Sequence, residues 1–373
     1  MVRCFEMNLR RLAPSEASYS EVSRIGIIVL LLLAFGLLMV YDASSATGVT
    51  DFNDKYYFLR EQVKWIIIGL SGMGVAFFFD YRQLKKLALP GLLIAIMMLI
   101  GVFLPGIGVR AYGASRWLNF GFTVVQPSEM AKLALVVYLS AWLTTREKGR
   151  LPAFLLLIGL LVGLIMLQPD MGTAVVLFLT AMILYFLSDN EILGLFFLMP
   201  LVLLGGIGLA LQSPYRVKRL LTFINPDADP LGASYHIRQA LIAIGSGGLF
   251  GLGLGNSIQK YSYLPEAATD SIFAIIGEEL GLLGTLGILG IFGYFFYLAA
   301  RLTLKVKDPF GQLLGMGIVS WFTVQTLVNI ASIIGLIPLT GVPLPFISYG
   351  GSALVVELAA LGILGNIWRQ NQI

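Results

Sequence analysis

Charged residues are scarce in this chain. Only 12% of its 373 residues are Asp, Glu, Lys or Arg, whereas 57% are hydrophobic, and the mean hydropathy is +0.85. A soluble domain carries about twice that charged fraction. The composition therefore excludes an ordinary soluble domain and indicates a polytopic membrane protein.

The chain also has a single cysteine and a single histidine, which excludes further classes. Cys4 has no second thiol to pair with and lies in a polar N-terminal segment, which favours an inert thiol. His236 cannot by itself form a histidine-based metal site, and we expect a surface or packing histidine. No P-loop, zinc-ligand spacing or Ser/His/Asp order is present in the sequence. The pI near 9.0 does not imply nucleic acid as a partner, because basic residues in membrane proteins mainly set orientation.

Long apolar runs predict an all-α bundle of ten transmembrane helices. The first run follows a polar lead, so it is interpreted as an uncleaved span, with residues 1–24 as a cytoplasmic N-terminal tail. Residues 25–373 then form one membrane domain, with a large extracellular loop, 212–271, between spans 7 and 8. The predicted spans are 25–42, 62–79, 87–104, 129–144, 152–168, 171–187, 191–211, 271–300, 311–335 and 352–368.

The short charged turns predict that both termini are cytoplasmic, because basic short loops stay on the inner side. A further set of cations is expected on the outer side. They are either surface charges near anionic headgroups or a site for a polyanionic headgroup such as a diphosphate. The set comprises Lys55, Arg60, Lys64, Arg110, Arg116, Lys132, Arg216, Lys218, Arg219, Arg238 and Lys260.

Asp270 lies where the long loop meets the eighth span. Pro265 breaks the chain before it, and Thr269 is expected to cap the helix. The carboxylate can simply stabilise the helix dipole, or it can act as a general base at the membrane face. A helix N-terminus lowers the pKa of an Asp, whereas a base benefits from a raised pKa. Burial must therefore outweigh the dipole if Asp270 is a base.

Three further segments carry polar groups near the outer ends of spans. Glu129 and Lys132 lie one turn apart and can pair, either to stabilise a helix end or as part of a cavity. Asp170 is either a helix cap or an acid that points into the same cavity. Ser348 lies in the Pro- and Gly-rich segment 341–352, which is predicted to be irregular. This segment is either a structural turn or a site for a phosphate or sugar.

The eighth span carries adjacent acids, Glu278 and Glu279, among glycines. Gly277 and Gly281 give this helix a small-residue surface, so close packing is the expected role. The glycine-rich stretch 245–255 lacks the Lys-Ser/Thr ending of a phosphate loop and is predicted to be a loop packed close to helices.

Together these segments resemble the SEDS family of bacterial cell-wall proteins, which includes RodA, FtsW and SpoVE. The resemblance covers nearly the whole chain after about residue 24 and leans toward the FtsW and sporulation branch. Three positions depart from the usual pattern: Ala268 replaces His, Ser271 replaces Phe, and His236 replaces Gln. The matching motifs are Gly113-Ala-Ser-Arg-Trp117, Gln126-Pro-Ser-Glu129 with Lys132, Gln168-Pro-Asp-Met-Gly172, Asp229-Pro-Leu-Gly232, Ala243-Ile-Gly-Ser-Gly-Gly248, Leu264-Pro-Glu266 with Thr269-Asp270, Gly277-Glu-Glu-Leu-Gly281 and Leu344-Pro-Phe-Ile-Ser-Tyr-Gly-Gly351.

The resemblance implies a peptidoglycan glycosyltransferase that polymerises lipid II at the outer face of the bacterial cytoplasmic membrane, with Asp270 as general base. It implies lipid II as substrate and a class B penicillin-binding protein as the transpeptidase partner. A divalent cation, Mg or Mn, can help to hold the diphosphate, although no dedicated site is evident. The residues expected to bind substrate or line its cavity are Arg116, Glu129, Lys132, Asp170, Arg216, Arg219, Lys260 and Ser348.

Two other functions stay open. A lipid II flippase also fits ten spans with Pro-broken helix ends and buried acids. Against it, the candidate polar groups gather at the outer face rather than at the midplane. A division scaffold with an inactive site is the third reading, because Ala268 stands where the family usually has His.

Overall fold

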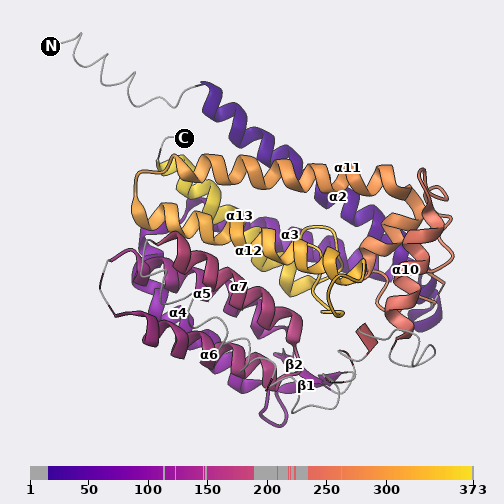
Figure 1. Ribbon diagram of the computed structural model, residues 1–373, viewed down its shortest axis with the longest axis horizontal. Helices are drawn as coiled ribbons and strands as arrows, with labels where there is room; N and C mark the ends of the chain where they lie inside the picture. The colour runs from indigo at the N-terminus through magenta and orange to yellow at the C-terminus, as the bar shows by residue number, and fades with distance from the viewer. Residues whose placement is uncertain are drawn as a thin grey trace.

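Long helices that run back and forth make up most of the chain in this computed structural model (Figure 1). The structure describes residues 16–111, 114–121, 123–145, 147, 149–188, 208, 217, 219, 222–223, 234–261 and 263–371. The long helices in these ranges are α2 (Glu16–Phe52), α3 (Tyr57–Phe78), α4 (Tyr81–Gly101), α5 (Pro127–Leu143), α6 (Leu151–Leu167), α7 (Met171–Leu187), α11 (Ile272–Leu304), α12 (Pro309–Ile333) and α13 (Gly351–Gln370).

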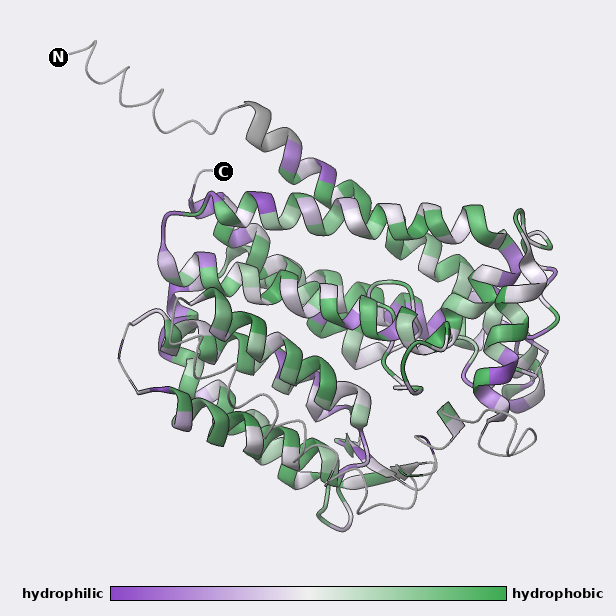
Figure 2. Ribbon diagram, in the orientation of Figure 1, coloured by the Kyte–Doolittle hydropathy of each residue, from purple (hydrophilic) through white to green (hydrophobic). Residues whose placement is uncertain are grey.

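The helix ends agree with most of the predicted spans to within a few residues. The main difference is α2, which begins at Glu16, well inside the expected tail, and continues to Phe52. The predicted seventh span, 191–211, lies outside the described residues apart from position 208. Among the described helices, five are long and apolar enough to cross a membrane. Apolar residues cover their lengths, and hydrophilic residues gather toward the helix ends (Figure 2).

The alternating helices define two ends of the bundle. We call the end that holds Asp270 the site end; the connections 53–56, 102–126, 168–170 and 334–350 lie there too. We call the other end the tail end, because α2 begins there and α13 finishes there (Figure 1). The described ends of the chain thus lie at one end of the bundle and Asp270 at the other.

Capping side chains and first-turn prolines mark the start of several helices. Asp308 accepts a hydrogen bond from the Gly311 amide (2.8 Å) before α12, and Pro309 occupies the first turn. Proline suits that position because its missing N–H would have no partner there. Thr269, expected to cap the eighth span, does not: the N-cap of α11 is Ser271, whose side chain makes no capping bond.

Two elements of the site end were not predicted. One is a small antiparallel sheet of β1 (Gly108–Ala111), β2 (Ala114–Asn119) and β3 (Val124–Val125), in the order β1-β2-β3. The other is helix α10 (Tyr235–Gly247). The start of the stretch 245–255, predicted to be a loop, therefore belongs to a helix.

Helix α10 packs closely against α11, as the glycines predicted. A Cβ atom on Gly247 would lie 2.0 Å from the Gly277 carbonyl oxygen, and one on Gly251 would lie 2.0 Å from the Glu279 carbonyl oxygen. Gly281 has φ 67° and breaks the regular helix at the contact with this segment. Only glycine adopts that conformation without strain.

Candidate functional site

Asp270 lies at the point where four parts of the chain meet. It precedes α11, and Asn329 of α12 donates from Nδ2 both to the Asp270 carbonyl (2.8 Å) and to the Val342 carbonyl (2.7 Å). The Tyr349 amide donates to the Ala268 carbonyl (2.8 Å). The turn that carries Asp270 is therefore bound to α12 and to the segment that precedes α13.

The Asp270 carboxyl is in a dehydrated setting. Burial raises its pKa from 3.8 to about 6, although the Thr269 hydroxyl, nearby backbone amides and the Arg219 guanidinium all act in the opposite direction. Thr269 Oγ1 lies 3.2 Å from Asp270 Oδ1. The residue as a whole is only partly buried, so part of its surface stays accessible. The effect of burial on the pKa of Asp270 thus outweighs the opposing effect of the groups at the helix start, as a general base at this position requires.

Arg219 brings a cation from the long loop to the same place. Its Nη1 donates to the Leu339 carbonyl (2.7 Å), and its charge favours the ionised form of Asp270. Arg216, predicted to act with it, lies outside the described residues.

Glu129 and Lys132 form the predicted ion pair, with Glu129 Oε2 2.8 Å from Lys132 Nζ. Both side chains are 2% exposed. Lys132 also donates to Gln325 Oε1 (2.7 Å), and Gln325 Nε2 donates to Glu357 Oε1 (2.9 Å) and to the Pro343 carbonyl (3.1 Å). The pair belongs to a buried network that connects α5, α12 and α13 with the irregular segment before α13.

Asp170 and Arg116 organise the start of α7. Asp170 caps this helix by accepting from the Thr173 amide (3.1 Å) and hydroxyl (2.9 Å), and it is 4% exposed. Arg116 of β2 donates from Nε to the Gln168 carbonyl (3.2 Å) and also hydrogen-bonds the Pro169 carbonyl. Of the two roles considered for Asp170, the structure shows the cap.

Ser348 closes a turn of its own segment. Its hydroxyl accepts from the Leu344 amide (2.8 Å), and the residue is 4% exposed. Residues 341–350 are free of regular helix, as predicted, whereas residues 351–352 already belong to α13. Phe346 within this segment has φ 63°. Of the two roles considered for this segment, the structure shows the structural turn, which Ser348 closes.

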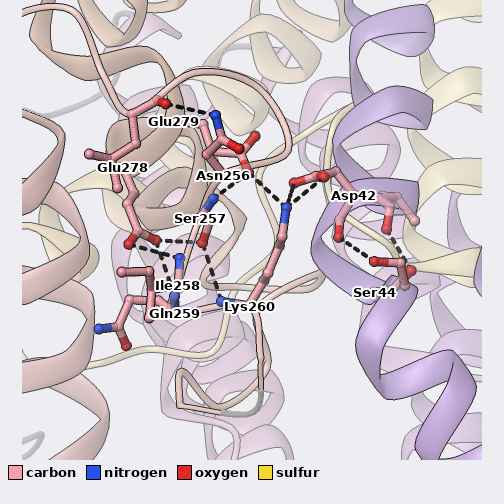
Figure 3. Close-up of polar contacts among 12 residues, drawn as sticks. Asp42, Ser44, Asn256, Ser257, Ile258, Gln259, Lys260, Glu278 and Glu279 are labelled. Carbon is pink, nitrogen blue, oxygen red and sulfur yellow. Dashed lines mark hydrogen bonds and ion pairs between the residues drawn. The ribbon is translucent and has the colours of Figure 1, made fainter.

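Lys260 lies in a buried ionic cluster that joins the loop after α10 to two helices (Figure 3). Its Nζ contacts Asp42 Oδ1 of α2 (2.8 Å) and Glu279 Oε1 of α11 (3.1 Å), and the Lys260 side chain is 3% exposed. These carboxylates raise the pKa of Lys260 although burial opposes them. Glu278 accepts from the Ile258 amide (3.1 Å), so both acids of the eighth span bind this loop.

Metal ligands do not cluster in the part of the chain that the structure describes: no three His, Cys, Asp or Glu side chains are placed to share an ion. A cavity lined by Thr144, Ser188 and Gln312 lies at the tail end. It is far from Asp270, because α11 alone spans about 50 Å at 1.5 Å per residue.

Two residues of the site were not predicted from the sequence. They are Asn329, which holds the Asp270 turn, and Gln325, which connects the buried network. Both lie in α12, four residues apart, and therefore face the same side of the helix. Two polar side chains at that spacing in an otherwise apolar helix could have indicated a buried polar site, because such groups are costly in lipid.

The fold and the site define a polytopic membrane protein with a polar, carboxylate-bearing centre at one end of its helical bundle. Residues 23–373 match the FtsW/RodA/SpoVE family model, described as cell cycle protein. The chain belongs to this family.

Curated relatives cover nearly the same length. Stage V sporulation protein E of Bacillus subtilis is 39% identical over 353 residues, 93% of this chain and 96% of the relative. The probable peptidoglycan glycosyltransferase FtsW of Geobacter metallireducens is 39% identical over 358 residues, 93% of this chain and 95% of that protein. The expected lean toward the FtsW and sporulation branch agrees with these relatives.

Solved structures share the fold. A chain from a peptidoglycan synthase complex, described for its coordination of polymerisation and crosslinking, superposes with TM-score 0.77 at 27% identity, covering 93% of this chain and 97% of that one. RodA of Thermus thermophilus superposes with TM-score 0.69 at 26% identity, covering 93% and 96%.

Proposed function

We propose that this protein is a peptidoglycan glycosyltransferase that polymerises lipid II, with Asp270 as the general base. The observation that carries the assignment of the base is the Asp270 carboxyl at the site end, whose pKa is raised by burial to about 6. A carboxylate with that pKa is ionised at neutral pH and is a stronger proton acceptor than an ordinary Asp. The names of the relatives and the peptidoglycan synthase complex support the reaction class.

In the proposed reaction, Asp270 takes the proton from the 4-hydroxyl of one disaccharide. The hydroxyl oxygen attacks the anomeric carbon of a glycan chain held on a lipid diphosphate. The bond from that carbon to the diphosphate oxygen breaks, and the lipid diphosphate leaves with the electron pair. Attack from the opposite face inverts an α-linked phosphate into a β-1,4 linkage.

Arg219 and Arg216 are proposed to stabilise the negative charge that grows on the leaving diphosphate. Arg219 is supported by its electrostatic effect on Asp270.

The remaining predicted residues are proposed to shape the site around these groups. Arg116, Lys132 and Lys260 already have partners. For any of them to bind the diphosphate, the substrate has to replace those contacts. Since these contacts hold the three cations in buried or partly buried positions, we propose that they organise the site. Glu129 holds Lys132, and Asp170 and Ser348 hold the backbone at the wall of the site.

Ten spans with both termini in the cytoplasm are proposed for the whole chain. This is supported by α7 ending at the tail end while α10 begins at the site end, so the chain between them connects opposite ends of the bundle. The site end would then face outward and meet lipid II. A class B penicillin-binding protein is proposed as the partner that crosslinks the new glycan.

The test is polymerisation of labelled lipid II by the purified full chain, alone and with a co-purified transpeptidase. Glycan ladders from the wild type that fall at least about 100-fold in Asp270→Asn are expected. Asp308→Asn is the matched control, because its carboxyl caps α12 at the tail end, away from Asp270, and should affect stability more than chemistry. Transport of lipid II without ladders would support a flippase, and inactivity with the partner present would support a scaffold. Either result would contradict the proposal.

A further inference from the structure

The only histidine of the chain lies against the residue that follows Asp270. His236 of α10 and Ser271 are joined by a hydrogen bond of 2.6 Å between Nε2 and Oγ. Ser271 is fully buried, and His236 is partly buried. The two residues are 35 positions apart, so the contact is a product of the tertiary fold.

The turn that carries Asp270 is held from three sides, and two of these contacts use its backbone alone. The Tyr349 amide binds the Ala268 carbonyl, and the Asn329 amide group binds the Asp270 carbonyl. Any side chains at those two acceptor positions would preserve these bonds. The third contact, between His236 and Ser271, depends on both side chains. It also connects the turn to α10.

The electrostatic setting keeps this contact neutral. Burial and the Arg219 guanidinium lower the pKa of His236 to about 4, while the Glu266 carboxylate acts weakly in the opposite direction. At neutral pH the ring is therefore uncharged. It can accept from the serine hydroxyl or donate to its oxygen, according to tautomer. In either form it places no positive charge beside the Asp270 carboxylate, whose charged neighbour is Arg219.

We infer that His236 and Ser271 form a positioning pair, which fixes the direction of the Asp270 carboxylate toward the acceptor hydroxyl. Ser271 shares a peptide bond with Asp270, so anchoring its side chain to α10 restricts rotation of the backbone that carries the base. A base must lie within hydrogen-bond reach of the proton that it takes, and a small misplacement is costly in rate. The inference rests on the proposed function of Asp270.

The experiment compares His236→Ala, His236→Gln, Ser271→Ala and the double alanine variant of the full chain in lipid II polymerisation. Each single alanine variant is expected to lower kcat about tenfold, with KM changed by less than about twofold. The double variant should lose no more than either single variant, because both remove the same contact. His236→Gln, whose side-chain amide can replace the ring nitrogen, should recover most of the rate.

The pH profile separates positioning from proton transfer. In His236→Gln the acid limb should keep its midpoint near the pKa of Asp270, about 6. Four outcomes would each overturn the proposed positioning role of the pair. These are an unchanged kcat in both alanine variants, additive losses in the double variant, an effect on KM alone, and a His236→Gln variant as inactive as Asp270→Asn. These results bear on the pair alone if the wild type polymerises lipid II and Asp270→Asn does not. A wild type without polymerase activity overturns the proposed function and this inference with it.

Discussion

At the scale of single residues, Asp270 shows how burial competes with local hydrogen bonds. Its neighbours in sequence, a helix start and a hydroxyl, stabilise the charged form, yet loss of water dominates and raises the pKa to about 6. The charged form is therefore less stable than in water and more reactive toward a proton. The position of Asp270 was predictable from the sequence, but this balance was not, because it depends on groups from α12 and the long loop.

The raised pKa of Asp270 predicts how activity and stability depend on pH. Polymerisation should fall as the pH is lowered through about 6, because the protonated carboxyl cannot accept a proton. The stabilising effect of a raised carboxyl pKa is fully present below the unfolded value and is lost as the pH rises through about 6. Asp270→Asn should therefore be as stable as the wild type, or more stable, near neutral pH.

Rate measurements across this pH range, with thermal unfolding in detergent at neutral pH, check both points. A marked loss of thermal stability in Asp270→Asn would show that the charged carboxylate stabilises the fold. That result would contradict the raised pKa.

Two ion pairs with the same spacing predict different costs of losing a lysine. Lys132 is 2% exposed beside Glu129, whereas Lys64 is 64% exposed beside Glu61. Lys132→Met should cost about 3–5 kcal/mol, because it leaves Glu129 buried without its cation. Lys64→Met should cost less than about 1 kcal/mol. Unfolding temperatures of the two variants provide the comparison, and equal shifts would contradict the buried network.

At the scale of elements, the packing of α10 and its following loop on α11 shapes the site end. The sequence predicted that the glycines of the eighth span allow close contact, and the structure confirms it. It did not predict α10 itself, because this helix has only 13 residues and lies within a long, mostly polar or glycine-rich stretch that was interpreted as a loop. The small sheet was missed for a similar reason: strands of two to six residues give little periodicity.

Gly281→Ala is predicted to destabilise this junction. The residue has φ 67°, and an added Cβ would lie 2.3 Å from the Gly251 amide nitrogen. Strain and overlap should together cost about 2 kcal/mol or more. Gly287→Ala in the same helix is the control, since no atom lies within 4 Å of its added Cβ, and helix propensity favours alanine by up to about 1 kcal/mol. Thermal unfolding of the two variants compares their stabilities. Equal unfolding temperatures would contradict the predicted strain at Gly281.

At the scale of the whole molecule, contacts between distant segments join the helices into one bundle. Lys260 binds Asp42, 218 positions away, and so connects α2 with the loop before α11. The sequence proposed Lys260 as a contact for diphosphate because it is a cation on the outer side. Its actual partners could not be predicted, because both carboxylates come from helices whose relative placement only the fold defines.

The proposed orientation of the bundle predicts which end reacts with an impermeant thiol reagent in intact cells. In a Cys4→Ala background, Tyr263→Cys at the site end should react in intact cells, since Tyr263 is 53% exposed. Lys307→Cys, exposed at the tail end, should react only after permeabilisation. The physical basis is the excess of Lys and Arg in the short tail-end turns. The reverse pattern of labelling would place the site in the cytoplasm and contradict synthesis at the outer face.

The sequence by itself determined that the chain is a helical membrane protein, where most of the described long helices lie, and that Asp270 precedes α11. These features follow from hydropathy and from local breaks, which are properties of neighbouring residues. Only the tertiary structure decided the raised pKa of Asp270, the ion pairs of Lys260 and the contact between His236 and Ser271. Burial and hydrogen-bond partners arise when distant segments meet, and local sequence does not specify those meetings.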